Sequence, residues 1–155
     1  MGEALIRPVR TGDVGLVALE LRPADLAEVL ACGAVDARDA LEASVAVSTV
    51  SLVALLDDRP LGMFGVAPDG LIGSSARAWL LTCREVDRHP VTFFRLTRQW
   101  LEVLLMLYPC LWNWVDARYT SAVSWLERLG FQLRPAVPHG PGDMLFRYAC
   151  LRREP

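Results

Sequence analysis

Lysine is absent from this 155-residue chain, so all 16 positively charged side chains are arginines, set against 18 acidic residues and a net charge of -2. This balance lacks the clustered positive excess of a dedicated nucleic-acid surface, so we expect no nucleic-acid partner. Arginine favours planar contacts with carboxylates and phosphates, but a GC-rich coding sequence is the simpler reason for the missing lysine.

Metal ligands are also scarce. The candidate ligands are six scattered side chains, Cys32, Cys83, Cys110, Cys150, His89 and His139. No two of the cysteines form a Cys-x-x-Cys pair, so we expect no metal site. Isolated cysteines at apolar positions are typical of small core residues in a reducing compartment.

Long apolar stretches are missing too. The longest run, residues 103–108, is much shorter than the roughly 20 residues that span a bilayer, and residues 1–10 contain no apolar signal core. We therefore expect a cytoplasmic protein without membrane attachment. Apolar residues make up 53% of the chain and charged residues 22%, which predicts one folded domain over residues 1–151 with a short frayed tail at 152–155.

The local patterns predict an ordered mixture of strands and helices. Runs of β-branched and apolar residues predict strands at residues 4–9, 50–56, 61–66, 78–82, 111–115, 131–133 and 143–151. Apolar residues at three- and four-residue spacing predict helices at residues 23–32, 36–48, 90–108 and 120–129. A tight turn at residues 57–60 makes a hairpin, and the Pro- and Gly-rich residues 135–142 read as a loop. Residues 14–21 fit either a strand or a short helix.

Three glycines carry local structural information. Gly130 follows the helix at 120–129 at the position that needs a left-handed backbone, so it should end that helix. Gly62 and Gly65 lie within a predicted strand, where glycine indicates a bulge or a close backbone approach.

The strand, helix and strand around Gly130 resemble the end of the Gcn5-related N-acetyltransferase (GNAT) fold, which carries Asn-x-x-Ala-x-x-x-Tyr-x-x-x-Gly-Phe. Ala122, Gly130 and Phe131 match this pattern, whereas Tyr119 stands at the Asn position and Leu126 at the Tyr position. In the family, that Asn contacts coenzyme A and that Tyr commonly protonates the departing thiolate. The resemblance implies an α+β fold with α/β/α layers, in which helices cover both faces of a mixed, mostly antiparallel sheet. It also favours a helix at residues 14–21.

The cofactor segment departs further from the family pattern. GNAT enzymes bind the coenzyme A diphosphate on backbone amides of Arg/Gln-x-x-Gly-x-Gly/Ala, where glycine allows close approach and a helix N-terminus favours an anion. Residues 82–90 contain no glycine here, and Glu85 and Asp87 place two negative charges in this segment. We therefore expect no cofactor and no catalytic residues.

The alternative is a divergent acetyltransferase that uses acetyl-CoA. In that case His89 and Asp116 are the candidate catalytic residues, although a histidine before a helix is more often a polar cap, and Asp-Ala-Arg after a strand is an ordinary helix start. The candidate cofactor-binding residues are then Leu81, Thr82, Arg84, Arg88, Arg118 and Tyr119.

The tryptophans offer a further hypothesis. Five are present, at positions 79, 100, 112, 114 and 125, and core packing is their simplest role. Any exposed member would mark a protein-binding surface. Trp112 and Trp114 should share one face of a strand.

The order of several segments is similar to that of a narrower group, the small GNAT-like internal core and assembly proteins of T7-like podoviruses. The segments are residues 21–29, residues 78–82 with the arginine-studded helix that follows, and residues 111–113 with the helix after them. The resemblance implies a catalytically degenerate protein that contacts virion components in the host cytoplasm and is incorporated in the virion. An acetyltransferase and a ligand sensor using the same cleft are the other hypotheses.

Overall fold

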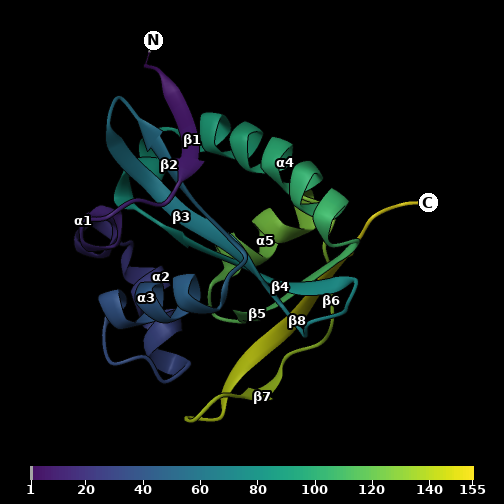
Figure 1. Ribbon diagram of the computed structural model, residues 1–155. Helices are drawn as coiled ribbons and strands as arrows, with labels where there is room; N and C mark the ends of the chain where they lie inside the picture. Colours follow the sequence, from purple (N-terminus) through teal and green to yellow (C-terminus); the bar gives the residue numbers. More distant parts are fainter. Residues whose placement is uncertain (1) are drawn as a thin grey trace.

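One eight-stranded sheet organises residues 2–155 in the computed structural model (Figure 1). The strands are β1 (Ala4–Pro8), β2 (Val50–Leu56), β3 (Arg59–Pro68), β4 (Ser75–Thr82), β5 (Cys110–Asp116), β6 (Gln132–Leu133), β7 (Val137–His139) and β8 (Met144–Arg152). The helices are α1 (Asp13–Glu20), α2 (Pro23–Ala31), α3 (Ala37–Val47), α4 (Pro90–Leu107) and α5 (Thr120–Arg128), and a short 3₁₀ helix, η1 (Arg84–Arg88), precedes α4.

The strands follow the order β1-β2-β3-β4-β5-β8-β6, and β7 also pairs with β8. Every pairing is antiparallel except the one between β4 and β5. That parallel pairing joins only residues 75–77 to residues 110–112, after which the two strands separate. The predicted mixed, mostly antiparallel sheet is confirmed.

Helices cover both faces of the sheet (Figure 1). Helices α1, α2 and α3 lie on one face, and α4 and α5 lie on the other. Strand β2 packs against helices on both faces of the sheet. Val53 and Leu55 pack toward α1 and α3, and Leu52 and Ala54, on the opposite face, pack toward α4. A strand buried on both faces reads as a continuous apolar run, which is the pattern of residues 50–56.

Most predicted elements are confirmed within one to three residues. The ambiguous residues 14–21 form helix α1, and the long helix at 90–108 is α4. Gly130 has φ 98° after α5, and the amides of Gly130 and Phe131 donate to the carbonyl oxygens of Glu127 and Leu126. This is the Schellman arrangement expected at a helix C-terminus.

Three predictions need correction. The loop at residues 135–142 contains strand β7, whose short pairing with β8 leaves no alternation in the sequence. The tail begins one residue later than expected, because Arg152 still pairs with Cys110 across β5 and β8. His89 occupies the N-cap position of α4, but its side chain accepts no hydrogen bond from the helix, so it is no side-chain cap.

Gly65 and Gly62 show why β3 needs glycine. A Cβ at Gly65 would collide with the carbonyl oxygen of Val50 and would lie 2.9 Å from the ring of Trp79. A Cβ at Gly62 would lie 2.7 Å from the carbonyl oxygen of Leu81, and the register of β2 and β3 shifts beside it. Both expectations, a bulge and a close approach, are confirmed in this strand.

The helices within residues 2–155 include none with the length and apolar character that crossing a membrane requires.

Candidate functional site

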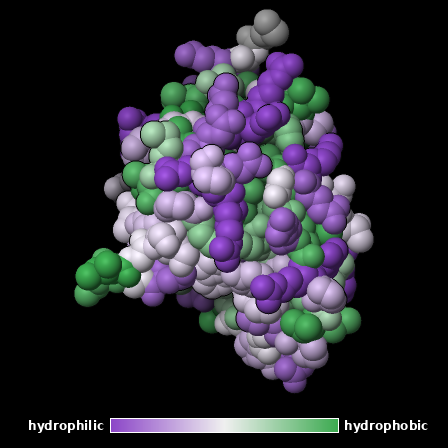
Figure 2. All heavy atoms as spheres, turned by 90° about the vertical axis from the view of Figure 1, so that its right-hand side faces the viewer, coloured by the Kyte–Doolittle hydropathy of each residue, from purple (hydrophilic) through white to green (hydrophobic). Residues whose placement is uncertain are grey.

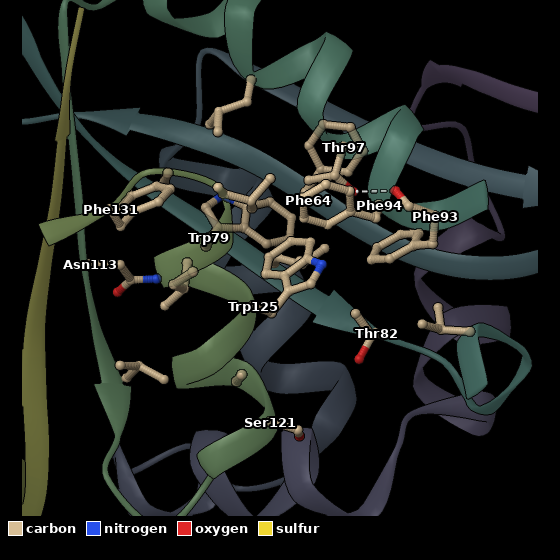
Figure 3. A pocket seen from close by; sticks show the side chains of 18 of the residues that line it. Phe64, Trp79, Thr82, Phe93, Phe94, Thr97, Asn113, Ser121, Trp125 and Phe131 are labelled. Atoms are coloured by element: carbon tan, nitrogen blue, oxygen red, sulfur yellow. Dashed lines mark hydrogen bonds between the residues drawn. The ribbon is translucent and has the colours of Figure 1, made fainter. Parts of the chain in front are cut away.

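A cavity of about 550 Å³ opens where β4 and β5 separate. Its walls come from both strands and from α4 and α5 (Figure 3). Apolar side chains dominate the lining, and the Phe and Trp side chains among them are Phe64, Trp79, Phe93, Phe94, Trp114, Trp125 and Phe131. Polar groups of Glu28, Thr82 and Tyr119 also reach it. An apolar cavity with a few polar groups is the usual form of a small-molecule site.

Trp125 of α5 is the central side chain of this cavity (Figure 3). Its ring stacks on Phe93 of α4 with centroids 6.0 Å apart, and it meets Phe94 edge-on at 6.5 Å. Leu126, which stands at the family's Tyr position, also lines the cavity and offers no proton. The interior near α5 is therefore apolar.

Asp25 of α2 binds the end of β4. Its carboxylate accepts hydrogen bonds from the backbone N–H of Thr82 at 3.0 Å, from the Thr82 hydroxyl at 2.8 Å and from the Tyr119 hydroxyl at 3.0 Å. The side chain is buried, and burial raises the pKa of Asp25 although all three hydrogen bonds oppose the shift. Burial also raises the pKa of Tyr119, so that its hydroxyl stays protonated as a donor.

Glu28 lies one helical turn further along α2 and binds the end of β5. Its Oε2 atom accepts the backbone N–H of Asp116 at 3.0 Å. Burial, with smaller contributions from Asp25 and Asp116, raises the pKa of Glu28 to about 7. A carboxyl group with this pKa lining a cavity can both accept and donate a proton near neutral pH.

Asp116 forms an ion pair with Arg118, two residues further along the chain. Its carboxylate pairs side-on with the Arg118 guanidinium, with Nη2 to Oδ2 at 2.6 Å and Nε to Oδ1 at 3.0 Å. Hydrogen bonding to Arg118 lowers the pKa of Asp116. A carboxylate held in this way is a weak base, so the pairing does not favour Asp116 for proton abstraction.

The segment between β4 and α4 folds as the 3₁₀ helix η1. Two amides of this segment bond within the turn: Val86 N–H donates to the Cys83 carbonyl at 3.1 Å, and His89 N–H donates to the Val86 carbonyl at 3.0 Å. The Glu85 carboxylate lies 3.4 Å from Nε2 of His89 and 3.8 Å from Nη1 of Arg88. Further contacts join Glu85 to Arg59 at 3.7 Å and Asp87 to Arg22 at 3.3 Å.

The structure therefore brings together only part of the predicted site. Thr82 and Tyr119 meet through Asp25, and Asp116 and Arg118 pair with each other beside them. Three other candidates lie elsewhere: Leu81 is buried against α1 and α3, Arg84 is exposed, and Arg88 pairs with Glu85. His89 also faces Glu85 rather than Asp116.

Sequence reasoning missed Asp25 and Glu28. Their i, i+3 spacing places both on one helix face, which is a usable signal. Acidic residues in the first turns of a helix are normally solvated, however, and only the approach of two distant strand ends makes Asp25 a buried acceptor and Glu28 a half-buried one. Within residues 2–155, no cluster of three or more His, Cys, Asp or Glu side chains could hold a metal ion.

Comparison with known proteins gives similarity at the level of fold. No protein-family model matches the sequence, and no curated protein matches it. The structure is similar to a GNAT-family acetyltransferase from Bacillus anthracis, with TM-score 0.71 and 12% identity over 98% of this chain and 96% of that one. It is also similar to a protein of Salmonella typhimurium solved with its cofactor acetyl-CoA, with TM-score 0.67 and 15% identity over 97% and 94% of the two chains.

A variant of spermidine N-acetyltransferase from Vibrio cholerae is a third such structure, with TM-score 0.67 and 12% identity over 96% of this chain and 93% of that one. The three neighbours share the mixed α+β architecture, so the fold is GNAT-like. At these sequence identities the similarity establishes the fold alone, and it does not establish an activity.

Proposed function

We propose that this protein is a catalytically degenerate GNAT-fold protein that acts through contacts with other proteins, as an internal core or assembly protein of a phage virion. The observation that carries the loss of catalysis is the η1 segment. A diphosphate needs free amides and no opposing charge. Here the amides of Val86 and His89 are bonded within the turn, and the segment presents the carboxylates of Glu85 and Asp87.

The charged side chains of this segment also oppose diphosphate binding. Arg88 and His89 could neutralise an incoming phosphate, but both already face Glu85. A diphosphate would have to displace a carboxylate from its partners, and repulsion between like charges would remain. The residues of this segment therefore fit coenzyme A poorly.

A surface loop supports the protein-contact part of the proposal. Leu71 and Ile72, between β3 and β4, are fully exposed at 106% and 100% of their reference areas. The base of the loop is held by Asp69, which accepts hydrogen bonds from Ser75 and from Trp112 Nε1 at 2.9 Å. An apolar tip on an anchored base suits insertion into a partner protein.

The face shown in Figure 2 is a mosaic in which apolar side chains stand out singly or in small groups among polar ones. The tryptophans do not supply an exposed aromatic patch, because Trp79 is buried and the other four are half-buried. The exposed anchors are aliphatic. Assignment to a virion rests on the resemblance to the podovirus proteins.

The testing experiment has two readouts. Thermal unfolding is measured with acetyl-CoA or coenzyme A in large excess, and we expect no shift. Ligand at about 100 times its Kd would add roughly 2.7 kcal/mol and raise the Tm by several degrees, which would overturn the loss of cofactor binding. Mass spectrometry of purified virions and procapsids is the second readout, and absence of the protein from both particles would overturn the assembly role.

A divergent acetyl-CoA-dependent N-acetyltransferase is the second candidate function, and Glu28 favours it. A carboxyl group with pKa about 7 in the cavity between the splayed strands is suited to take a proton from an amine. This candidate predicts the Tm shift with acetyl-CoA, followed by acetylation of an amine panel that Glu28→Gln abolishes while the Tm shift persists. Cofactor binding without acetylation would instead indicate a ligand sensor.

A further inference from the structure

Cys110 and Cys150 form a pair of neighbouring thiols on the sheet. Their Sγ atoms lie 3.5 Å apart. Cys110 begins β5 and faces Arg152, whereas Cys150 on β8 faces Trp112, so the cysteines are diagonal neighbours on the same side of two paired strands. Both are half-buried, and Cys110 borders a surface hollow that Asp69, Tyr148 and Arg152 also line. Small solutes in this hollow therefore reach Cys110, and the half-buried Cys150 lies beside it.

The separation is compatible with a covalent bond. Diagonal neighbours on antiparallel strands lie about 7–8 Å apart at Cα, slightly beyond the range usual for disulfides. The two sulfurs already touch, and forming an S–S bond of about 2.05 Å requires them to approach by roughly 1.5 Å. Side-chain rotation and a small adjustment at the end of β5 can supply this movement.

Arg152 supplies the electrostatic component. Its pKa is raised first by hydrogen bonding with the Cys150 side chain and then by the neighbouring Cys110. A guanidinium beside a sulfur stabilises the thiolate, which is the nucleophilic form. Burial, and after it the neighbouring Cys150, raise the pKa of Cys110, which favours the protonated form of Cys110.

We propose that Cys110 and Cys150 are a site of reversible oxidation, closing from a dithiol to a disulfide when a hydroperoxide such as hydrogen peroxide reaches them. The Cys150 thiolate attacks one peroxide oxygen, the O–O bond breaks, and the departing hydroxide takes a proton to leave as water. The Cys110 sulfur then attacks the Cys150 sulfenic sulfur, the S–O bond breaks, and the released hydroxide takes the Cys110 proton as a second water. The dithiol loses two electrons, and the peroxide is reduced.

The disulfide would fasten the start of β5 to the end of β8, beside the hydrogen bond that holds Asp69 to Trp112. This site is separate from the cavity and does not depend on the proposed function. The other thiols provide controls. Burial raises the pKa of Cys83 to about 12, which makes it unreactive, and Cys32 is exposed and isolated from the pair.

The experiment uses the full chain with Cys32→Ser, which prevents disulfide bonds between molecules through Cys32. After treatment with hydrogen peroxide and alkylation, we expect two thiols to be protected and the unalkylated mass to fall by about 2 Da, the two hydrogens lost on disulfide formation. Dithiothreitol should reverse both changes. A non-reducing digest should contain one peptide pair that joins Cys110 to Cys150.

Two variants and one further measurement make the test decisive. Adding Cys110→Ser or Cys150→Ser should abolish the mass loss, and the Cys110→Ser protein should accumulate a sulfenic acid that dimedone traps on Cys150. The oxidised protein should melt several degrees higher than the reduced one, since the bond closes a long loop. Retention of both thiols, or oxidation to sulfonic acids without a crosslink, would overturn the proposal.

Discussion

Asp25 and Glu28, one turn apart on α2, accept the backbone N–H groups of Thr82 and Asp116 at 3.0 Å each, and so bind the ends of the two strands that have separated. Continued pairing of β4 with β5 could have satisfied such amides. Because the strands splay, their buried amides need other acceptors, and α2 provides one carboxylate for each strand. Helix α2 therefore joins the two strand ends where they border the cavity.

Removing the Asp25 carboxylate should destabilise the protein. Asp25→Ala leaves the Thr82 amide, the Thr82 hydroxyl and the Tyr119 hydroxyl without their acceptor, and we expect the free energy of unfolding to fall by about 2–4 kcal/mol. Urea unfolding measures this change. Asp87→Ala is the matched control, because Asp87 is exposed and its loss should change stability by less than about 0.5 kcal/mol. Equal effects of the two variants would contradict the role of Asp25.

Glu28 should give stability a distinctive pH dependence. Its pKa is about 7 in the folded protein against 4.5 for an ordinary glutamate, so between these values the native state binds more protons than the unfolded state. The free energy of unfolding contributed by Glu28 therefore falls as pH rises from about 4.5 to 7 and is level above that. The native state is therefore more stable, relative to the unfolded state, when Glu28 is protonated.

Glu28→Gln should remove this dependence, since the amide stays neutral and can still accept the Asp116 N–H. We expect the free energy of unfolding of the variant to equal that of the parent near pH 4.5 and to exceed it by about 1–3 kcal/mol at pH 8. Urea unfolding at both pH values measures this difference. Glu42→Gln, at an exposed helix position, is the control, and it should change the free energy of unfolding by the same amount at both pH values. A Glu28→Gln difference that is the same at both pH values would refute the raised pKa.

Gly65 should tolerate no side chain. An alanine methyl there would collide with the Val50 carbonyl and the Trp79 ring, so Gly65→Ala should lower the free energy of unfolding by about 3 kcal/mol. Gly70→Ala is the matched control, because its methyl would meet no atom within 4 Å and should change stability by less than about 0.5 kcal/mol. Thermal unfolding of both variants measures the contrast, which a stable Gly65→Ala protein would disprove.

The Leu71 and Ile72 tip should matter for association and not for folding. The double variant Leu71→Ser with Ile72→Ser removes side chains that contact solvent, so its Tm should match that of the parent. Each lost apolar anchor weakens partner binding by about 1–2 kcal/mol, which predicts a tenfold or greater loss from purified virions, scored by quantitative mass spectrometry. Val35→Ser, at another exposed apolar position, is the control. Unchanged incorporation would remove this loop as the contact surface.

Much of the fold could be predicted from local patterns. The helix end at Gly130 needs a left-handed residue, and Gly130 has φ 98°. Residues 50–56 form a strand because an apolar run of this length, followed by a turn, suits a strand buried on both faces. Strand β7 was missed, since three residues containing a proline carry no periodic signal.

The sequence by itself determined the order of strands and helices, because spacing and backbone preference are local properties. It also contains no glycine and two acids in the segment after β4, whereas the mixed sheet was expected from the resemblance to the GNAT fold. Only the tertiary structure decided which polar groups form the site. Asp25 becomes a buried acceptor and Glu28 a half-buried one, and the Glu28 pKa rises to about 7, because strands 57 and 88 residues away end against α2. Burial and proximity of distant segments are not encoded in any single stretch of the chain.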